Sequence, residues 1–186
     1  MTVYAAILKG INVGSSHRIK MEDLRKVFES MGLSHIKTYI QSGNVIFESD
    51  EKGTSLCKKI ELGIEAAFGF EAVVVLRTKD EVDEIIQNCP FSKEEISQAE
   101  ASNSEGESLY VALLPEEPIK GNVEKIEALR TVNDDIRFKG RDAYILLRHS
   151  IRSSKMAAGL QRMEGTSTVR NWKTLQNISK LMKEQS

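Results

Sequence analysis

The sequence contains few of the residues on which metal, redox and disulfide proteins depend. Only two cysteines and three histidines occur among 186 residues, and they form no CxxC or HExxH pattern. This scarcity excludes a disulfide framework and argues against a zinc or histidine-based metal site. The motifs GxxxxGK(S/T) and GxSxG are also missing, which excludes a Walker phosphate loop and a nucleophile elbow. We therefore expect no metal and no cofactor.

An excess of one charge sign is missing as well. The chain has 26 basic and 27 acidic residues, for a net charge of -1. No global positive field attracts nucleic acid, so any anion site must come from a local cluster. Aromatic residues make up 6%, too few on the candidate strands for generic RNA stacking, so nucleic acid is a disfavoured partner. The opening segment "MTVYAAILKG" lacks a basic region and its apolar run is short, so we expect a soluble cytoplasmic protein without membrane association.

Hydrophobic periodicity is what the sequence does contain, and it predicts the same element order twice. In the first half it indicates strand, helix, two strands, helix and strand, followed by a further helix. The corresponding segments are "VYAAILK", "MEDLRKVFESM", "HIKTYIQ", "NVIFES", "SLCKKIELGIEAAFG", "EAVVVLRT" and "KDEVDEIIQNC". The second half repeats this order from "SLYVALLP" onward. The segments "VLRTKDEVDEI" and "TVRNWKTLQNI" align without a gap, which pairs Arg77 with Arg170.

This repeat predicts an α+β protein made of two tandem ferredoxin-like βαββαβ units, each followed by an extra helix. Right-handed crossovers give each sheet the strand order 4-1-3-2. We expect the first unit at 1–90 and the second at 108–186. The Ser/Glu-rich segment 91–107 has no long apolar face, so it is expected to be a linker or mobile loop.

The predicted topology brings the glycine-rich segment "KGINVGSSHRIK" beside the hairpin "QSGN" in the first unit. Glycine-opened backbone and a helix start favour anions, and side-chain amides can bind the edges of a ligand. The alternative is that the glycines serve left-handed turns and the asparagines cap backbone groups. The candidate ligand-binding residues at this end are Gly10, Asn12, Gly14, Lys20, Gln41, Ser42 and Asn44.

The same reasoning brings "RHSIRSSK" and "VRNW" together in the second unit. A local cationic patch is expected there, beside a helix that begins at Ser153 or Ser154. The alternative is ordinary helix capping with solvated cations, and Trp172 is expected to pack in the core. The candidate ligand-binding residues of this second patch are Arg152, Lys155, Arg170 and Asn171.

Other chemistry-bearing residues give weaker signals. The loop residue His17 could act as a base in an anion site, although a single loop histidine is more often neither base nor ligand. The carboxylate pairs Glu94-Glu95 and Asp134-Asp135 fall in polar stretches and are expected to be solvated. No combination of nucleophile, base and orienting residue emerges, so the catalytic residues stay unknown.

The motifs at the two ends of the chain resemble those of the DUF1697 family, a bacterial family of unknown function. The opening "LKGINVGSSHRIKMEDLRKVFESMGLSHIKTYIQSGNVIFES" is similar to that family's RGINVGG, K-M-x-x-L and TYLQSGNVVF patterns. The segment "RSSKMAAGLQRMEGTSTVRNWKTLQNISKL" is similar to its RSK and T-x-RNW-x-T segments. Lys9 stands where the family usually has arginine, and Ser15 where it usually has a second glycine. Because lysine provides a point charge rather than a bidentate fork, Lys9 is a doubtful key residue. The resemblance implies a tandem ferredoxin-like build and no known activity.

Three functions remain open at this point. The first is a binding module for a small anionic ligand, such as a nucleotide or a phosphorylated metabolite. The second is an enzyme acting on a phosphorylated substrate, which requires a titratable group in a cleft. The third is a protein-interaction domain, with its partner unknown. Because a small anion suits the slightly acidic overall charge better than RNA does, we favour the first.

Overall fold

The computed structural model describes residues 1–185. The chain forms two compact units. The first unit consists of Met1–Glu84 together with the residues from Gln176 onward, and the second unit is Ile85–Leu175. In the described part of the chain, no helix is both long and apolar enough to cross a bilayer.

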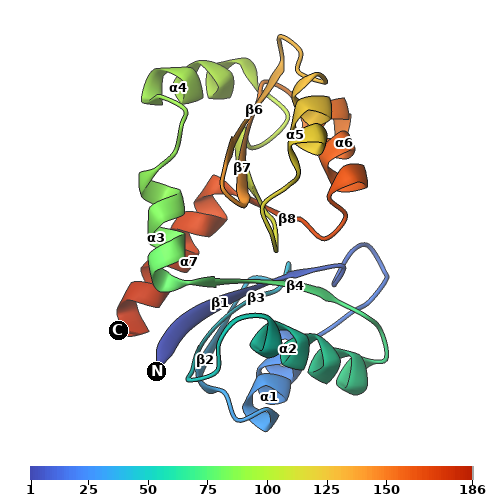
Figure 1. The fold of residues 1–186 in the computed structure, drawn as a ribbon, viewed down its shortest axis with the longest axis vertical. Helices are drawn as coiled ribbons and strands as arrows, with labels where there is room; N and C mark the ends of the chain where they lie inside the picture. The colour runs from blue at the N-terminus through green and yellow to red at the C-terminus, as the bar shows by residue number, and fades with distance from the viewer. Residues whose placement is uncertain (186) are drawn as a thin grey trace. The chain divides into compact units, whose positions relative to one another are not determined.

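The first unit contains a four-stranded antiparallel sheet in the order β2-β3-β1-β4. Helices α1 and α2 cover one face of this sheet (Figure 1). The strand order is the predicted one. The elements are β1 (Thr2–Lys9), α1 (Met21–Ser30), β2 (Ser34–Tyr39), β3 (Asn44–Ser49), α2 (Gly53–Phe68), β4 (Val73–Thr78) and α3 (Lys79–Gln87).

Alternation along β1 builds the core of the first unit. Tyr4, Ala6 and Leu8 join the apolar cluster under α1 and α2, which includes Phe28 and Ile60. Successive side chains of a strand point to opposite faces, so every second residue of β1 serves this core. Burial of a large apolar side chain stabilises the fold by about 1.5 to 3 kcal/mol, so this cluster contributes substantially to the stability of the unit.

The second unit contains another four-stranded antiparallel sheet, in the order β6-β7-β5-β8. Helices α5 and α6 pack beside each other over one face of it (Figure 1). The protein is therefore of mixed α+β class, with two sheets of corresponding strand order. The elements are α4 (Lys93–Ser102), β5 (Leu109–Leu113), α5 (Lys120–Glu127), β6 (Asp134–Lys139), β7 (Asp142–Leu147), the 3-10 turn η1 (Ile151–Ser153), α6 (Lys155–Met163) and β8 (Thr168–Asn171). The last helix, α7 (Trp172–Gln185), begins in this unit and continues into the residues of the first.

The two sheets correspond in register as well as in order. In the first, Tyr4 pairs with Thr78 across β1 and β4. In the second, Tyr110 pairs with Asn171 across β5 and β8. Thr78 accepts a hydrogen bond from the backbone N–H of Glu81 at the start of α3, and Asn171 accepts one from that of Thr174 at the start of α7. Arg77 precedes Thr78 and Arg170 precedes Asn171. The two arginines are therefore equivalent, as the sequence alignment predicted.

Residues 91–107, expected to form a linker or mobile loop, contain the ten-residue helix α4. A capping box starts it: Ser92 accepts from the backbone N–H of Glu95, and the Glu95 carboxylate accepts from that of Ser92. Ala99 is the fully buried residue of this helix. Because one small residue leaves no apolar stripe, the hydrophobic pattern did not reveal the helix. The division of the chain into domains at 91–107 stays a prediction.

Candidate functional site

The glycine-rich loop at 10–20 and the β2–β3 hairpin lie side by side in the first unit. The backbone N–H of Leu8 donates to the carbonyl oxygen of Gly43 at 2.9 Å. The Asn12 side chain donates to the carbonyl oxygen of Gln41 at 2.8 Å. The predicted proximity of the two segments is confirmed.

The side-chain amides of Asn12 and Asn44 form hydrogen bonds with backbone groups of this region. Asn12 also donates to the carbonyl oxygen of Ile19 at 3.1 Å and accepts from the N–H of Ile19 at 2.8 Å. Asn44 is fully buried and donates to the carbonyl oxygen of Tyr39 at 2.9 Å and to the hydroxyl of Ser42 at 3.2 Å. These contacts match the architectural alternative for the two asparagines.

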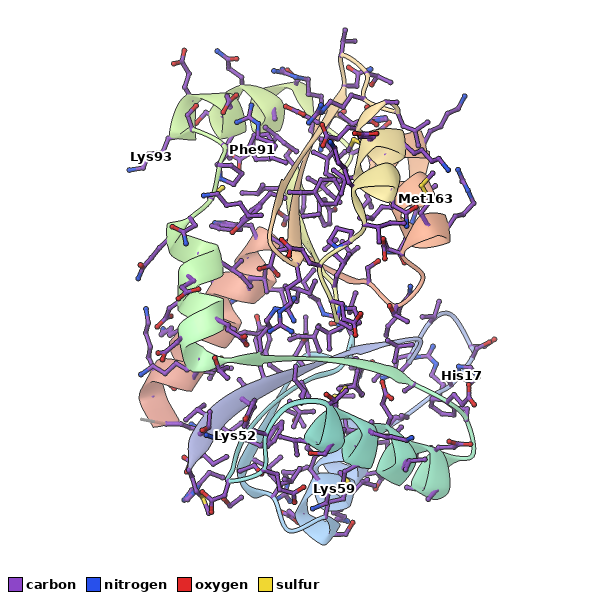
Figure 2. The ribbon with its side chains drawn as sticks, in the orientation of Figure 1. His17, Lys52, Lys59, Phe91, Lys93 and Met163 are labelled. Atoms are coloured by element: carbon purple, nitrogen blue, oxygen red, sulfur yellow. The ribbon has the colours of Figure 1, made fainter. Side chains whose placement is uncertain are left out.

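His17 fixes the same loop from its exposed side. His17 is labelled in Figure 2. Its ring stacks on Phe70 with centroids 4.1 Å apart, and its Nδ1 lies 2.9 Å from the carbonyl oxygen of Gly10. Both contacts hold the loop in shape, so His17 has a structural role here.

The remaining residues predicted at this end differ in exposure. Gly14, Lys20, Gln41 and Ser42 are exposed. Lys9 is half-buried, and burial lowers the pKa of its amine. Ligand binding by the residues of this loop and hairpin stays a prediction.

The second predicted patch is spread over both faces of the second sheet. Arg152 and Lys155 are exposed around the start of α6, on the helix-covered face. Val169 packs into the core under the helices, so its neighbour Arg170 points to the opposite face. Arg170 is 9% exposed, and burial lowers its pKa to about 10. Asn171 caps α7. Alternation along β8 therefore separates Arg170 from the two exposed cations, and binding by these residues stays a prediction.

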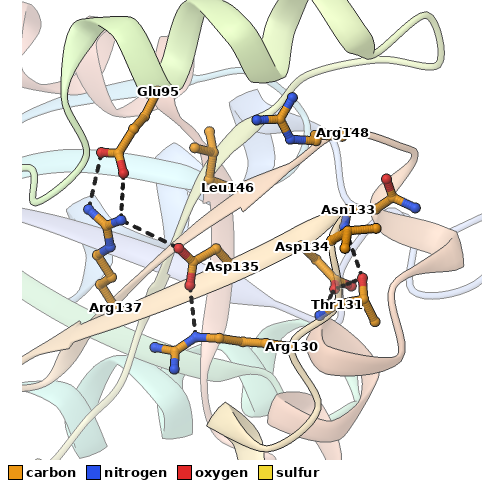
Figure 3. Close-up of a pocket in the computed structure, with 10 residues that line it drawn as sticks. Glu95, Arg130, Thr131, Asn133, Asp134, Asp135, Arg137, Leu146 and Arg148 are labelled. Atoms are coloured by element: carbon orange, nitrogen blue, oxygen red, sulfur yellow. Dashed lines mark hydrogen bonds and ion pairs between the residues drawn. The ribbon is translucent and has the colours of Figure 1, made fainter.

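The second unit also contains a pocket that the sequence reasoning did not identify. Its volume is about 490 Å³, and it lies between α4, the loop before β6, and strands β6 and β7 (Figure 3). Eight of its ten lining residues are polar or charged. The ten lining residues are Glu95, Arg130, Thr131, Val132, Asn133, Asp134, Asp135, Arg137, Leu146 and Arg148, and the two apolar ones are Val132 and Leu146.

A chain of ion pairs crosses one side of this pocket. Arg137 binds Glu95 with two parallel hydrogen bonds of 2.6 and 3.2 Å (Figure 3). Asp135 pairs with Nε of Arg130 at 2.7 Å and lies 3.5 Å from Arg137. The hydrogen bonds from Arg137 and then from the Ser92 backbone lower the pKa of Glu95 to about 2. These four charged side chains tie α4 to β6 and neutralise one another.

Asp134 forms the buried floor of the pocket. The sequence predicted a solvated carboxylate, but Asp134 is only 4% exposed, so this prediction is wrong. It accepts hydrogen bonds from the backbone and hydroxyl of Thr131 and from the hydroxyl of Ser154 at 2.8 Å. The ring Nε2 of His149 lies 3.5 Å away. Burial raises the pKa of Asp134, but the hydrogen bonds from Thr131 and Ser154 outweigh it and the net pKa is lowered. Asp134 therefore stays ionised and fixes three segments.

Arg148 differs from the other two arginines that line the pocket. Its Nη1 donates to the carbonyl oxygen of Gln98 at 3.4 Å and to the hydroxyl of Ser102 at 3.1 Å, both on α4. Within residues 1–185 no carboxylate pairs with it, and its Nε and Nη2 have no hydrogen-bond partner. Helix α4 thus fixes the guanidinium at Nη1. The edge formed by Nε and Nη2 stays available to bind an anion through two hydrogen bonds.

The charged residues of the pocket carried one sequence signal that could have revealed them. Ser92 and Glu95 form an S-x-x-E capping box, which predicts a helix start and places Glu95 in its first turn. Arg130, Asp135 and Arg148 occur in ordinary polar contexts that form no motif, and the β6–β7 hairpin and α4 bring them together. As for metals, the described residues hold no cluster of three or more His, Cys, Asp or Glu suited to an ion.

Comparison with known proteins gives a family and a fold. The profile of the DUF1697 family, described as a protein of unknown function, matches residues 1–144. A search of curated proteins finds no match. The structure of the conserved bacterial protein SP0830 from Streptococcus pneumoniae matches with a TM-score of 0.76 at 22% identity, over 98% of this chain and 99% of that one. An unknown protein from Galdieria sulphuraria matches with a TM-score of 0.23 at 12% identity, over 91% of this chain and 95% of that one.

Proposed function

Since the chain belongs to the DUF1697 family of proteins of unknown function, we propose a function from its own geometry: it is a binding module for a small anionic ligand. The ligand binds in the pocket of the second unit, with its anionic group on Arg148. This assignment keeps the ligand class expected from the sequence and moves the site to residues that the sequence did not single out.

The single observation that carries the proposal is the state of the Arg148 side chain. A guanidinium has five N–H donors and binds carboxylate or phosphate through two parallel hydrogen bonds. Only the Nη1 end of Arg148 is used, by Gln98 and Ser102 of α4. Because α4 already fixes the side chain, an anion that binds the Nε and Nη2 edge costs little side-chain ordering.

The size and polarity of the pocket support the same class of ligand. Small-molecule pockets usually have volumes of about 300 to 1,000 Å³, and this one measures about 490 Å³. Most such pockets are apolar with a few polar groups, whereas this lining is mainly charged and amide-bearing. A hydrophilic ligand satisfies these groups better than an apolar one.

We also propose that the two units descend from one duplicated ferredoxin-like βαββαβ unit. The corresponding strand orders and the equivalent pairs Tyr4–Thr78 and Tyr110–Asn171 support this origin. Fold alone assigns no ligand, so the binding proposal depends on Arg148 and its surroundings.

A thermal-shift series tests the proposal. Inorganic phosphate, acetate and adenosine monophosphate are titrated against the wild type, Arg148→Ala and the control Arg162→Ala, which removes an exposed arginine of α6 in the same unit. A ligand at about 100 times its Kd stabilises the fold by about 2.7 kcal/mol. We expect a saturable shift in the wild type and the control that is lost in Arg148→Ala. If no anion shifts the wild type, or if Arg148→Ala keeps the full shift, the proposal is wrong.

A further inference from the structure

We infer that the ligand of this pocket is a compact polyhydroxylated anion, of the sugar-phosphate or sugar-acid class, with one anionic group on Arg148 and its hydroxyls on Asp135 and Asn133. The inference rests on the proposed function, because it takes Arg148 as the anchor.

Two polar groups of the lining have capacity left for hydroxyl groups. The Oδ1 atom of Asp135 accepts from Nε of Arg130 and from the backbone N–H of Ile136 at 2.8 Å. Its Oδ2 atom has only the 3.5 Å contact with Arg137. The side-chain amide of Asn133 makes no hydrogen bond with any described residue. A carboxylate oxygen accepts from a hydroxyl and an amide both donates and accepts, so together they suit a polyol.

The lining offers no surface for a nucleobase. Its apolar members are Val132 and Leu146, and none of its ten residues is aromatic. The nearby ring of Phe91 is covered by the guanidinium of Arg137, whose central carbon lies 4.2 Å from the ring centroid. Base recognition draws much of its affinity from stacking on aromatic side chains. A nucleobase would therefore add little here to the affinity of a sugar phosphate.

The charges of the lining favour a ligand with a single anionic group. Arg130 and Arg137 are already paired with Asp135 and Glu95, which leaves Arg148 as the cation without a paired carboxylate in the described part of the pocket. A second phosphate would lie against the carboxylates of this charge-balanced wall, and like charges repel. Added anionic groups should therefore not tighten binding.

Calorimetric titration measures separately how much the anionic group and the hydroxyl groups of the ligand contribute to its affinity. The probes are inorganic phosphate, acetate, glucose 6-phosphate, gluconate, glucose and adenosine monophosphate. We expect glucose 6-phosphate to bind at least tenfold tighter than inorganic phosphate, and adenosine monophosphate to bind no tighter than glucose 6-phosphate. Glucose alone should show no binding. The comparison of gluconate with glucose 6-phosphate shows which of the two anionic groups the site prefers.

A matched pair of variants assigns the gain to the polyol contacts. Asn133→Ala should remove most of the tenfold gain of glucose 6-phosphate and leave the affinity for inorganic phosphate unchanged. Asn88→Ala removes an exposed asparagine side chain of the same unit that lies outside the lining, and it should change neither of these affinities. If phosphate binds through Arg148 but neither glucose 6-phosphate nor gluconate binds tighter than its head group, this inference fails while the proposed function stands. If none of the anions binds, both fail.

Discussion

Glu95 of α4 binds Arg137 of β6 through two parallel hydrogen bonds, 2.6 and 3.2 Å long. The same carboxylate accepts from the backbone N–H of Ser92 at 2.8 Å and so completes the cap of its helix. One side chain therefore both starts α4 and attaches it to the second sheet. This pair is one of the contacts that hold α4 beside the pocket.

Glu95→Gln should keep the helix cap and lose the charged pair. We expect the free energy of unfolding at pH 7 to fall by about 1 kcal/mol, a value reduced for screening because the Glu95 side chain is 40% exposed. Urea unfolding measures it. Glu94→Gln, which removes a neighbouring carboxylate of the same helix, serves as the control and should change stability by less than about 0.5 kcal/mol.

The Glu95–Arg137 pair should also make the free energy of unfolding fall as the pH is lowered. The folded pKa of Glu95 is about 2, against an ordinary value of 4.5. A carboxyl with a depressed folded pKa stabilises the fold above its unfolded pKa and loses that contribution as the pH falls toward the folded value. The difference in stability between wild type and Glu95→Gln should therefore shrink between pH 5 and pH 2. A difference that stays constant over this range would contradict the assignment.

Gly43→Ala tests the contact between the hairpin and the loop in the first unit. A Cβ atom at Gly43 would lie 2.5 Å from Cδ1 of Ile11 and 3.0 Å from Cβ of Leu8, at a φ of +92°. We expect a loss of about 3 kcal/mol, from crowding added to the left-handed backbone. Gly14→Ala, with a φ of +57° and open space around it, should cost only about 1 kcal/mol. Equal losses of stability in the two variants would show that crowding of the new Cβ atom against Ile11 and Leu8 adds nothing to the cost.

Asn12→Ala should loosen the loop because the amide joins three backbone groups. Loss of these hydrogen bonds should lower the free energy of unfolding by about 2 kcal/mol. Hydrogen exchange gives a local readout, since the N–H of Ile19 donates to Asn12 Oδ1. That amide should exchange at least tenfold faster in the variant, while the amide of Leu24 inside α1 should change much less. Unchanged exchange at Ile19 would leave Asn12 as a surface residue available for ligand binding.

The sequence predicted the elements whose signals are local. The strand at β1 and the helix at α1 each needed only a short window of hydrophobic periodicity. The equivalence of Arg77 and Arg170 followed from repeated patterns and agrees with the pairing register. Repetition supplied the topology, because the same element order appeared twice.

What the sequence did not reveal depends on contacts between distant segments. Helix α4 is held by Ala99 and by polar groups, so hydrophobic periodicity could not indicate it. Asp134 looked solvated beside Asp135, yet the turn at Thr131 and the start of α6 at Ser154 bury it. The pocket joins residues 95 to 148, and no short pattern encodes that combination.

Asp134→Asn tests the pocket floor. The carboxylate accepts three hydrogen bonds while 4% exposed, and an amide nitrogen would face a donor at one of these positions. We expect a loss of about 2 to 3 kcal/mol in urea unfolding. Because the folded pKa of Asp134 is lowered, its contribution should be present at neutral pH and decline as the pH falls below about 4. Asp50→Asn, with a side chain 77% exposed, is the control, and a loss no greater than in this control would contradict the buried network.

The most direct test of the central claim observes the Arg148 side chain itself. Inorganic phosphate is titrated into protein with labelled arginines, and the Nε–H resonances of Arg148 and Arg162 are followed by NMR after assignment with single variants. If the available edge of Arg148 binds the anion, its resonance should move along a saturable curve while that of Arg162 stays in place. If the Arg148 resonance does not move, or moves no more than that of Arg162, the anion site is not in this pocket.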